Sequence, residues 1–319
     1  MVEEIINKIN KIPPTILVIG DLMLDRFIFG SVDRISPEAP VPIVKFKKED
    51  QMLGGCGNVI RNLNNLGIKT PLYSVVGQDL AGDLLIEQLI EKDVPISNIL
   101  RLSNIRTTEK MRIVADRQQV ARVDWDMNDL NVQFSEELIK NINEQIQNID
   151  GIIISDYAKG VCSEALLKKI IKISNDNNTP IFVDPKGPNW GKYEYTNLIT
   201  PNIKEAEKIL GQKLENDGDF EIASEKICST FNIEACLITR GGDGMSFFCK
   251  NNIFHLRSNA KEIFDVSGAG DTVISAIAIG LVLGLTYKQA AEFSNQAAGI
   301  VVGHIGTSAI TKQELLNIN

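Results

Sequence analysis

The segment from residue 265 to 280, DVSGAGDTVISAIAIG, combines a glycine-rich turn with an acidic side chain. Gly268, Ala269 and Gly270 let the backbone approach an anion closely, and the apolar run after them predicts a helix whose first N–H groups point into the same space. Asp271 stands at the start of that helix, beside the place where a phosphate would lie. The segment predicts an anion hole with a carboxylate next to it, although such a carboxylate could also simply cap the helix.

Two other phosphate-binding motifs are excluded. The GxGxxG spacing of dinucleotide-binding proteins is absent from this segment, and no GxxxxGK[ST] sequence occurs anywhere in the chain. The expected anion site is therefore neither a dinucleotide fingerprint nor a P-loop.

Asn202 and Glu205 lie one helical turn apart in TPNIKEAE, at the junction of an expected strand and an expected helix. Both side chains can face one water-ligated cation. The same spacing also fits an N-cap residue and its partner at the third helical position.

Polar residues closely follow several of the apolar runs. In an open parallel sheet the ligand binds beyond the carboxyl ends of the strands. One polar residue there is commonly a turn or cap residue, but several at corresponding ends predict a polar cleft. The residues in question are Asp21, Asp156, Asp184, Asn202 and Arg240.

Short β-branched runs alternate along the chain with stretches of helical periodicity. This alternation predicts an α/β fold in which helices cover both faces of a parallel sheet. The expected strands are residues 15–20, 71–77, 151–156, 180–184, 197–200 and 235–240. The expected helices are residues 58–66, 82–92, 163–175, 203–210 and 219–231, and the apolar run 273–285 is expected to be a buried helix.

Residues 31–50 and 107–124 break this rhythm with extended alternation of polar and apolar residues. They predict an antiparallel flap attached to the α/β core. No internal repeat or low-complexity linker is present, so residues 1–319 are expected to form a single domain with a small β lid.

The composition of the chain disfavours nucleic acid and membranes as partners and indicates which ligands a metal could have. The 33 Lys and Arg residues against 41 Asp and Glu residues give a net charge of −8, without a basic block, which disfavours nucleic acid. The five cysteines form no CxxC pair and indicate a reducing cytoplasm, and the N-terminus has no signal-peptide pattern. The longest apolar run is too short for a bilayer, so no membrane partner is expected. With only two histidines in the chain, a metal should have oxygen ligands.

The sequence DxxGAGD near the C-terminus resembles the second signature of the ribokinase-like (PfkB-type) sugar kinases, which have a three-layer α/β/α fold with a β lid. In that family the last aspartate is the catalytic base, and the preceding backbone amides hold the transferred phosphoryl group. The resemblance implies these roles for Asp271 and for Gly268, Ala269 and Gly270.

Two N-terminal segments resemble the sugar-binding motifs of the same family. LGGCGNVIRNLNNLG, residues 53–67, resembles its first signature, and GDLMLD, residues 20–25, resembles its N-terminal aspartate motif. The resemblance implies contacts with sugar hydroxyls for Gly54, Gly55, Asn58, Asp21 and Asp25.

Three further segments resemble the nucleotide-binding parts of the family. The N-x-x-E of TPNIKEAE implies a magnesium site, in which Asn202 and Glu205 act through water, and TRGGDG resembles the nucleotide loop. An asparagine on the last long helix is expected to face the adenine. The implied nucleotide-binding residues are Asn202, Ile203, Lys204, Glu205, Thr239, Arg240, Gly242, Gly244 and Asn295.

Within the family, ISPEAPVP (35–42), SDYAKG (155–160) and VDPKG (183–187) resemble the D-glycero-β-D-manno-heptose-7-phosphate kinases of ADP-heptose synthesis, the route to the lipopolysaccharide core. Those kinases are often fused to a nucleotidyltransferase domain. The resemblance implies ATP and Mg²⁺, with a monovalent cation as a further candidate, transfer to O1 of the sugar phosphate, and a homodimer paired through the lid.

A sugar phosphate also needs cations for its own phosphate group. Lys186 follows a strand end, and Arg112, Arg117 and Arg122 lie on the expected flap, so these are the candidates, with Asp156 and Asp184 on the sugar side. Two alternatives stay open. One is a related kinase for another sugar, sugar phosphate or nucleoside, and the other is a nucleotide-binding regulatory or dehydrogenase-like α/β protein.

Overall fold

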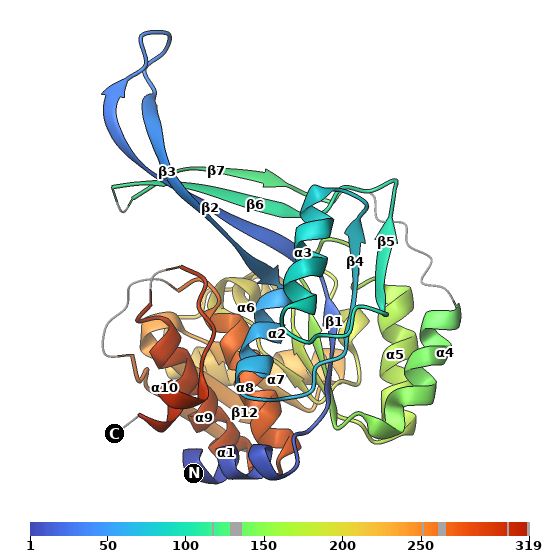
Figure 1. Cartoon of the computed structure of the whole chain (residues 1–319). Helices are drawn as coiled ribbons and strands as arrows, with labels where there is room; N and C mark the ends of the chain where they lie inside the picture. Colours follow the sequence, from blue (N-terminus) through green and yellow to red (C-terminus); the bar gives the residue numbers. More distant parts are fainter. Residues whose placement is uncertain (117, 128–135, 251, 261–265, 305, 318–319) are drawn as a thin grey trace.

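A nine-stranded sheet forms the centre of the computed structural model, in the order β13-β12-β11-β10-β9-β8-β1-β4-β5 (Figure 1). The model describes residues 1–116, 118–127, 136–250, 252–260, 266–304 and 306–317. Neighbouring strands run parallel from β5 to β11, and β12 and β13 add an antiparallel edge. The strands are β1 Ile16–Gly20, β4 Leu72–Gly77, β5 Ile99–Leu102, β8 Gly151–Ser155, β9 Ile181–Asp184, β10 Leu198–Ile199, β11 Ala235–Thr239, β12 Met245–Cys249 and β13 Asn252–Leu256.

Helices cover both faces of this sheet, because its strands send alternate side chains into two separate cores. In β1, Ile16 and Val18 enter one core while Leu17 and Ile19 enter the other. The first core is closed by α1 Val2–Lys11, α2 Cys56–Asn65, α3 Leu80–Ile90, α8 Ala269–Val282, α9 Tyr287–Val301 and α10 Lys312–Leu316. The second is closed by α4 Glu136–Gln145, α5 Glu164–Asp176, α6 Ile203–Leu210 and α7 Asp217–Phe231. Short 3-10 turns lie at Ile146–Asn148, Gly191–Tyr193 and Gly241–Asp243.

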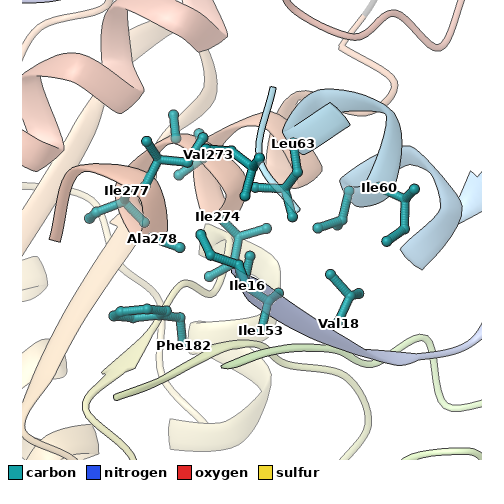
Figure 2. Close-up of a cluster of buried hydrophobic side chains, with 14 of the residues drawn as sticks. Ile16, Val18, Ile60, Leu63, Ile153, Phe182, Val273, Ile274, Ile277 and Ala278 are labelled. Carbon is teal, nitrogen blue, oxygen red and sulfur yellow. The ribbon is translucent and has the colours of Figure 1, made fainter. Parts of the chain in front are cut away.

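Helix α8 is predominantly apolar, and its residues from Asp271 to Gly280 are all buried. Figure 2 shows Ile274 and Ile277 of α8 packed above Ile16 and Ile153 of the sheet, with Leu63 of α2 beside them. The expected buried helix is therefore confirmed. In the described parts of the chain, no helix has the length and apolar character needed to cross a bilayer.

A second sheet of four strands, in the order β3-β2-β6-β7, projects from the body of the molecule (Figure 1). Its strands are β2 Leu22–Ile35, β3 Pro42–Gly55, β6 Glu109–Ala115 and β7 Gln118–Trp125. The flap was predicted within residues 31–50 and 107–124, but β2 begins almost directly after β1 and β3 continues to α2. The first residues of β2 are buried and lack alternation, so their pattern did not separate them from the core.

The order of strands in the large sheet places a crevice next to β1. The chain continues from β1 to β4 and β5 on one side, and β8 to β11 follow on the other. The carboxyl ends of β1 and β8 therefore lie side by side at the point where the order reverses, which is where ligands bind in open α/β sheets.

Candidate active site

Asp271 lies in the first turn of α8, and only 4% of its surface is exposed. Its Oδ2 atom accepts a hydrogen bond of 2.9 Å from Nδ2 of Asn58 in α2, and its Oδ1 atom accepts one of 2.7 Å from the hydroxyl of Tyr157. Three segments that are distant in sequence thus fix one carboxylate. The sequence did not point to Tyr157, although it stands inside the motif SDYAKG.

Burial raises the pKa of Asp271 to about 6, because the charged form loses solvation. The hydrogen bonds from Asn58 and Tyr157 favour the charged form and act against this increase, as does the charge of Lys110, whereas Asp25 adds to it. A carboxylate with this pKa is mostly ionised at neutral pH and is still basic enough to take a proton from a hydroxyl group.

The turn before Asp271 depends on glycine. Gly268 is the N-cap of α8 with a left-handed φ of 80°, and a Cβ there would lie 2.5 Å from Nδ2 of Asn58. At Gly270 the nearest atom to such a Cβ would be Oδ2 of Asp184, at 4.0 Å. The backbone beside Asp271 is therefore open, and the N–H groups at the start of α8 can receive an anion.

A cavity of 150 Å³ lies directly in front of this turn. Its wall includes Gly268, Gly270 and Asp271 from the turn, and Asp184 and Lys186 from the end of β9. The space has the size of a phosphoryl group with its immediate surroundings. Burial, and then the charges of Asp271 and Glu205, raise the pKa of Asp184 well above its ordinary value.

A larger cavity of 480 Å³ adjoins the first one and shares Asn202, Thr239 and Gly270 with it. Its volume is in the range of cofactor sites. Eight of the nine predicted nucleotide-binding residues line it, and Glu205 lines the smaller cavity instead. The eight are Asn202, Ile203, Lys204, Thr239, Arg240, Gly242, Gly244 and Asn295.

The apolar wall of the larger cavity was not predicted from the sequence. Ala298 of α9 and Val302, the residue that follows this helix, contribute to it together with Asn295, whose Nδ2 donates to the Arg257 carbonyl at 2.7 Å. Ala298 follows Asn295 by three residues, and Val302 follows Ala298 by four. This spacing places all three on one side of a helix, so the sequence around Asn295 contained a signal for this wall. Arg240, which also lines this cavity, donates a hydrogen bond from Nη1 to Asp217 Oδ1 at 2.6 Å.

Asn202 and Glu205 form a capping box at the start of α6, which the sequence allowed as the alternative to a cation site. Asn202 Oδ1 accepts from the Glu205 backbone, and Glu205 Oε2 accepts from the Asn202 backbone, both at 3.0 Å. Glu205 Oε1 pairs with Lys186 Nζ at 2.6 Å. Among the described residues no three or more His, Cys, Asp or Glu side chains form a metal cage. The donors here suit Mg²⁺, which is usually held by one or two carboxylates, waters and substrate phosphates.

The residues expected at the sugar gather on the other side of Asp271. Asp25 Oδ1 accepts from Arg112 Nη1 at 2.7 Å, and a Cβ on Gly54 would lie 2.5 Å from Asp25 Oδ2. Asn58, which bonds Asp271, also accepts from Arg61 Nη1 at 3.2 Å. Arg61 was not predicted. Gly55 forms the turn into α2 with a φ of 58°.

Asp21, which was expected to contact the sugar, is hydrogen-bonded within the protein. Its Oδ1 accepts from the backbone of Val161 at 3.0 Å, and its Oδ2 accepts from the backbones of Tyr157 and Lys159 at 2.8 and 3.1 Å. The carboxylate holds the loop that carries Tyr157, and this loop uses both of its oxygens.

Asp156 is also satisfied within the protein, although it too was expected to bind the sugar. It accepts from the Ala158 backbone and the Tyr193 hydroxyl at 2.6 Å each, and it pairs with half-buried Lys192. Asp156 and Asp184 both line the phosphate-sized cavity.

The cations expected at the distal phosphate lie in different places. Lys186 was a candidate, but it pairs with Glu205 on the nucleotide side of Asp271. Arg122 pairs with Asp124 at 2.9 Å. Arg112 does lie on the sugar side, and Arg117 is outside the described residues.

Comparison with known proteins agrees with this geometry. The model of the pfkB family of carbohydrate kinases matches residues 14–314. The chain therefore belongs to the pfkB family of carbohydrate kinases, and the prediction of a phosphotransferase that acts on a carbohydrate is confirmed.

The relatives are more specific. The chain is 40% identical over 302 residues to the Bifunctional protein HldE of Trichlorobacter lovleyi, with 94% of the chain and 62% of the relative aligned. The corresponding protein of Helicobacter pylori is 41% identical over 301 residues, with 94% and 65% aligned. The chain thus spans less than two thirds of the length of these relatives.

Solved structures support the fold. A ribokinase from Arabidopsis thaliana, complexed with ribose and ATP, superposes with a TM-score of 0.79 at 18% identity over 96% of this chain and 98% of that one. Phosphofructokinase-2 from Escherichia coli, in complex with potassium, gives 0.78 at 18% identity with the same coverage. The predicted ribokinase-like three-layer fold is confirmed.

The buried charge of Asp271 makes a prediction about stability. Its pKa is raised from 3.8 to about 6 on folding, so the folded state binds the proton more tightly and loses stability as pH rises between these values. Asp271→Asn should therefore be more stable than the wild type at pH 8, by up to about 3 kcal/mol. Urea unfolding at pH 5 and pH 8 measures this, and a difference that does not increase with pH would contradict it.

Proposed function

We propose that the chain is an ATP-dependent kinase that phosphorylates O1 of D-glycero-β-D-manno-heptose 7-phosphate and forms the 1,7-bisphosphate for ADP-heptose biosynthesis. The observation that carries the kinase chemistry is Asp271, buried between the phosphate-sized cavity and the group around Asp25. A cytoplasmic location follows from the proposed reaction with a soluble sugar phosphate and ATP.

The choice of sugar rests on two kinds of support. ISPEAPVP, SDYAKG and VDPKG resemble heptose-7-phosphate kinases, which are often fused to a second enzyme domain. The relatives at about 40% identity are named as bifunctional HldE proteins, and this chain aligns with 62 to 65% of their length. A single kinase domain over residues 1–319 agrees with both.

The proposed reaction is an in-line transfer of the γ-phosphoryl group of ATP. The larger cavity holds the nucleotide, and the N–H groups at the start of α8 hold the transferred group. Asp271 takes the proton from the acceptor hydroxyl, while Asn58 and Tyr157 keep its carboxylate in place. Mg²⁺, held through water by Asn202 and Glu205, would balance charge on the phosphate oxygens.

The four-stranded sheet is proposed to act as the lid of this site. Its strands β2 and β3 join the body at Asp25 and Gly54, so a small rotation of the sheet would cover the sugar. Exclusion of water by such a lid would limit the hydrolysis of ATP without transfer.

The function is tested by measuring ADP release with a panel of acceptors. We expect the highest kcat/KM for the heptose 7-phosphate, with ribose, fructose 6-phosphate and a nucleoside as comparisons. Asp271→Asn should retain ATP binding and lose about 10²- to 10⁴-fold in kcat, because a positioned base contributes that much. Wild-type turnover in this variant would remove Asp271 from the mechanism.

The other outcomes of the panel separate the alternatives. A clear preference for ribose or a nucleoside would replace the proposed substrate and keep the kinase. Binding of NAD without phosphoryl transfer to any acceptor would support the dehydrogenase-like alternative.

The metal assignment predicts a selective effect at Glu205. Glu205→Gln keeps an oxygen that can accept from the Asn202 backbone but removes the charge, so it should raise the Mg²⁺ concentration for half-maximal rate more than the KM for sugar. Glu207→Gln is the matched control, because Glu207 lies on the same helix outside both cavities and pairs with Lys213. Equal Mg²⁺ dependence in wild type and Glu205→Gln would leave only the capping role.

The lid is also proposed to pair two chains in a homodimer. It exposes large apolar side chains, among them Phe46 at 62% and Ile35 at 59%, and a second copy of the same surface would bury them. Sedimentation should give the mass of a dimer, and Phe46→Lys should shift it toward monomer. A wild type that stays monomeric at every concentration would refute this pairing.

A further inference from the structure

A group of cations lies on the face of the small sheet that looks toward the active site. Lys110 and Arg112 are two residues apart in β6, so their side chains share one face of the sheet. The strand partner of Lys110 in β2 is Asp25. The Lys110 ammonium lies 5.4 Å from the centre of the Tyr157 ring, and the Tyr157 hydroxyl donates to Asp271. Lys110 therefore lies on the sugar side of the base, one tyrosine ring away from it.

The other cations of this face already have partners. Arg112 pairs with Asp25 at 2.7 Å, Arg122 pairs with Asp124 at 2.9 Å, and Lys159 of the neighbouring loop pairs with Asp126 at 2.6 Å. The exception is Lys110.

Lys110 is half-buried, and no carboxylate of the described residues lies at ion-pair distance from it. Burial is the largest cause that lowers the pKa of Lys110, and the charges of Arg112 and Lys159 lower it further, whereas the charges of Asp25 and Asp124 act in the opposite direction. An ammonium group in this position is costly unless an anion balances it.

In the proposed function the transferred phosphate occupies the phosphate-sized cavity, so it cannot be the anion that balances Lys110. The N–H groups of the α8 turn, Lys186 and Glu205 all face the phosphate-sized cavity on the nucleotide side of Asp271. Lys110 is not part of its wall. The cationic face is therefore available for a second phosphate, one that belongs to the acceptor.

We propose that Lys110 is the main anchor for the phosphate group that the acceptor sugar carries, with Arg112 and Lys159 at the edge of the same anion site. The ligand class is a phosphate monoester dianion on a sugar whose reacting hydroxyl reaches Asp271. This assignment rests on the proposed function, because it requires a sugar phosphate as acceptor. It replaces Lys186 in that role.

The test compares two acceptors, the heptose 7-phosphate and the free heptose, in wild type and Lys110→Met. The loss of one charged hydrogen bond should lower kcat/KM for the phosphorylated sugar by roughly 10- to 150-fold. The free sugar loses no such bond, so its value should fall much less, only through the lost support of Lys110 for the charge on Asp271, and the ratio between the two sugars falls. Lys69→Met is the control, since Lys69 is an exposed lysine at the amino end of the large sheet, and it should leave both values unchanged.

Lys110→Arg keeps the charge and should keep most of the preference for the phosphorylated sugar, which covers the case in which the methionine variant does not fold. An equal loss on both sugars in Lys110→Met, or a loss of the preference in Lys110→Arg equal to that in Lys110→Met, would overturn the assignment. So would a wild type that uses the two sugars equally well.

Failure of the proposed substrate gives a different result. If the wild type ignores the heptose 7-phosphate but prefers another sugar phosphate over its free sugar, the heptose assignment is wrong. The same ratio, measured with that other pair of sugars, then still decides the role of Lys110.

Discussion

The structure is organised around one ionisable group that is kept away from water. As the proposed base, Asp271 would need a negative charge, yet almost none of its surface is exposed, so the protein must supply the interactions that solvent would give. Asn58 supplies one hydrogen bond from α2, and Tyr157 supplies another from the loop after β8. The position of the carboxylate therefore depends on the packing of α2, α8 and the sheet, which is the apolar cluster shown in Figure 2.

Several other carboxylates surround this site and would repel a phosphate if all were free. The fold neutralises two of them internally: Asp21 is bonded to three backbone N–H groups, and Asp156 is paired with Lys192. The same bonds fix the loop that carries Tyr157. Asp184 also lines the phosphate-sized cavity, and its pKa is raised because burial and the charges of Asp271 and Glu205 disfavour its ionised form. Carboxylates that look alike in the sequence thus have different functions.

The sequence predicted elements well where the signal is local. Helix α6 was expected at residues 203–210 and is found there, because Asn202 and Glu205 cap it and Gly211 ends it with a left-handed φ of 67°. The turn around Gly268 has the left-handed glycine and the helix start that its sequence predicted, because backbone chemistry defines both. The site was not predicted where tertiary pairing decides, since only the fold shows that Asp21 is satisfied, that Lys186 meets Glu205, and that Tyr157 reaches Asp271.

In the proposed mechanism the two halves of the site would recognise their ligands by different means, and this difference would separate chemistry from specificity. On the nucleotide side the anion would meet N–H groups of α8, whose direction is fixed by a helix buried in the main core. On the acceptor side the charged groups project from β6 of a sheet that joins the body along few strands. Under the proposed mechanism, a substitution on that sheet would change which acceptor fits and would leave Asp271 in place. The small sheet would then set the preference for the sugar, while the turn around Asp271 would carry the phosphoryl transfer.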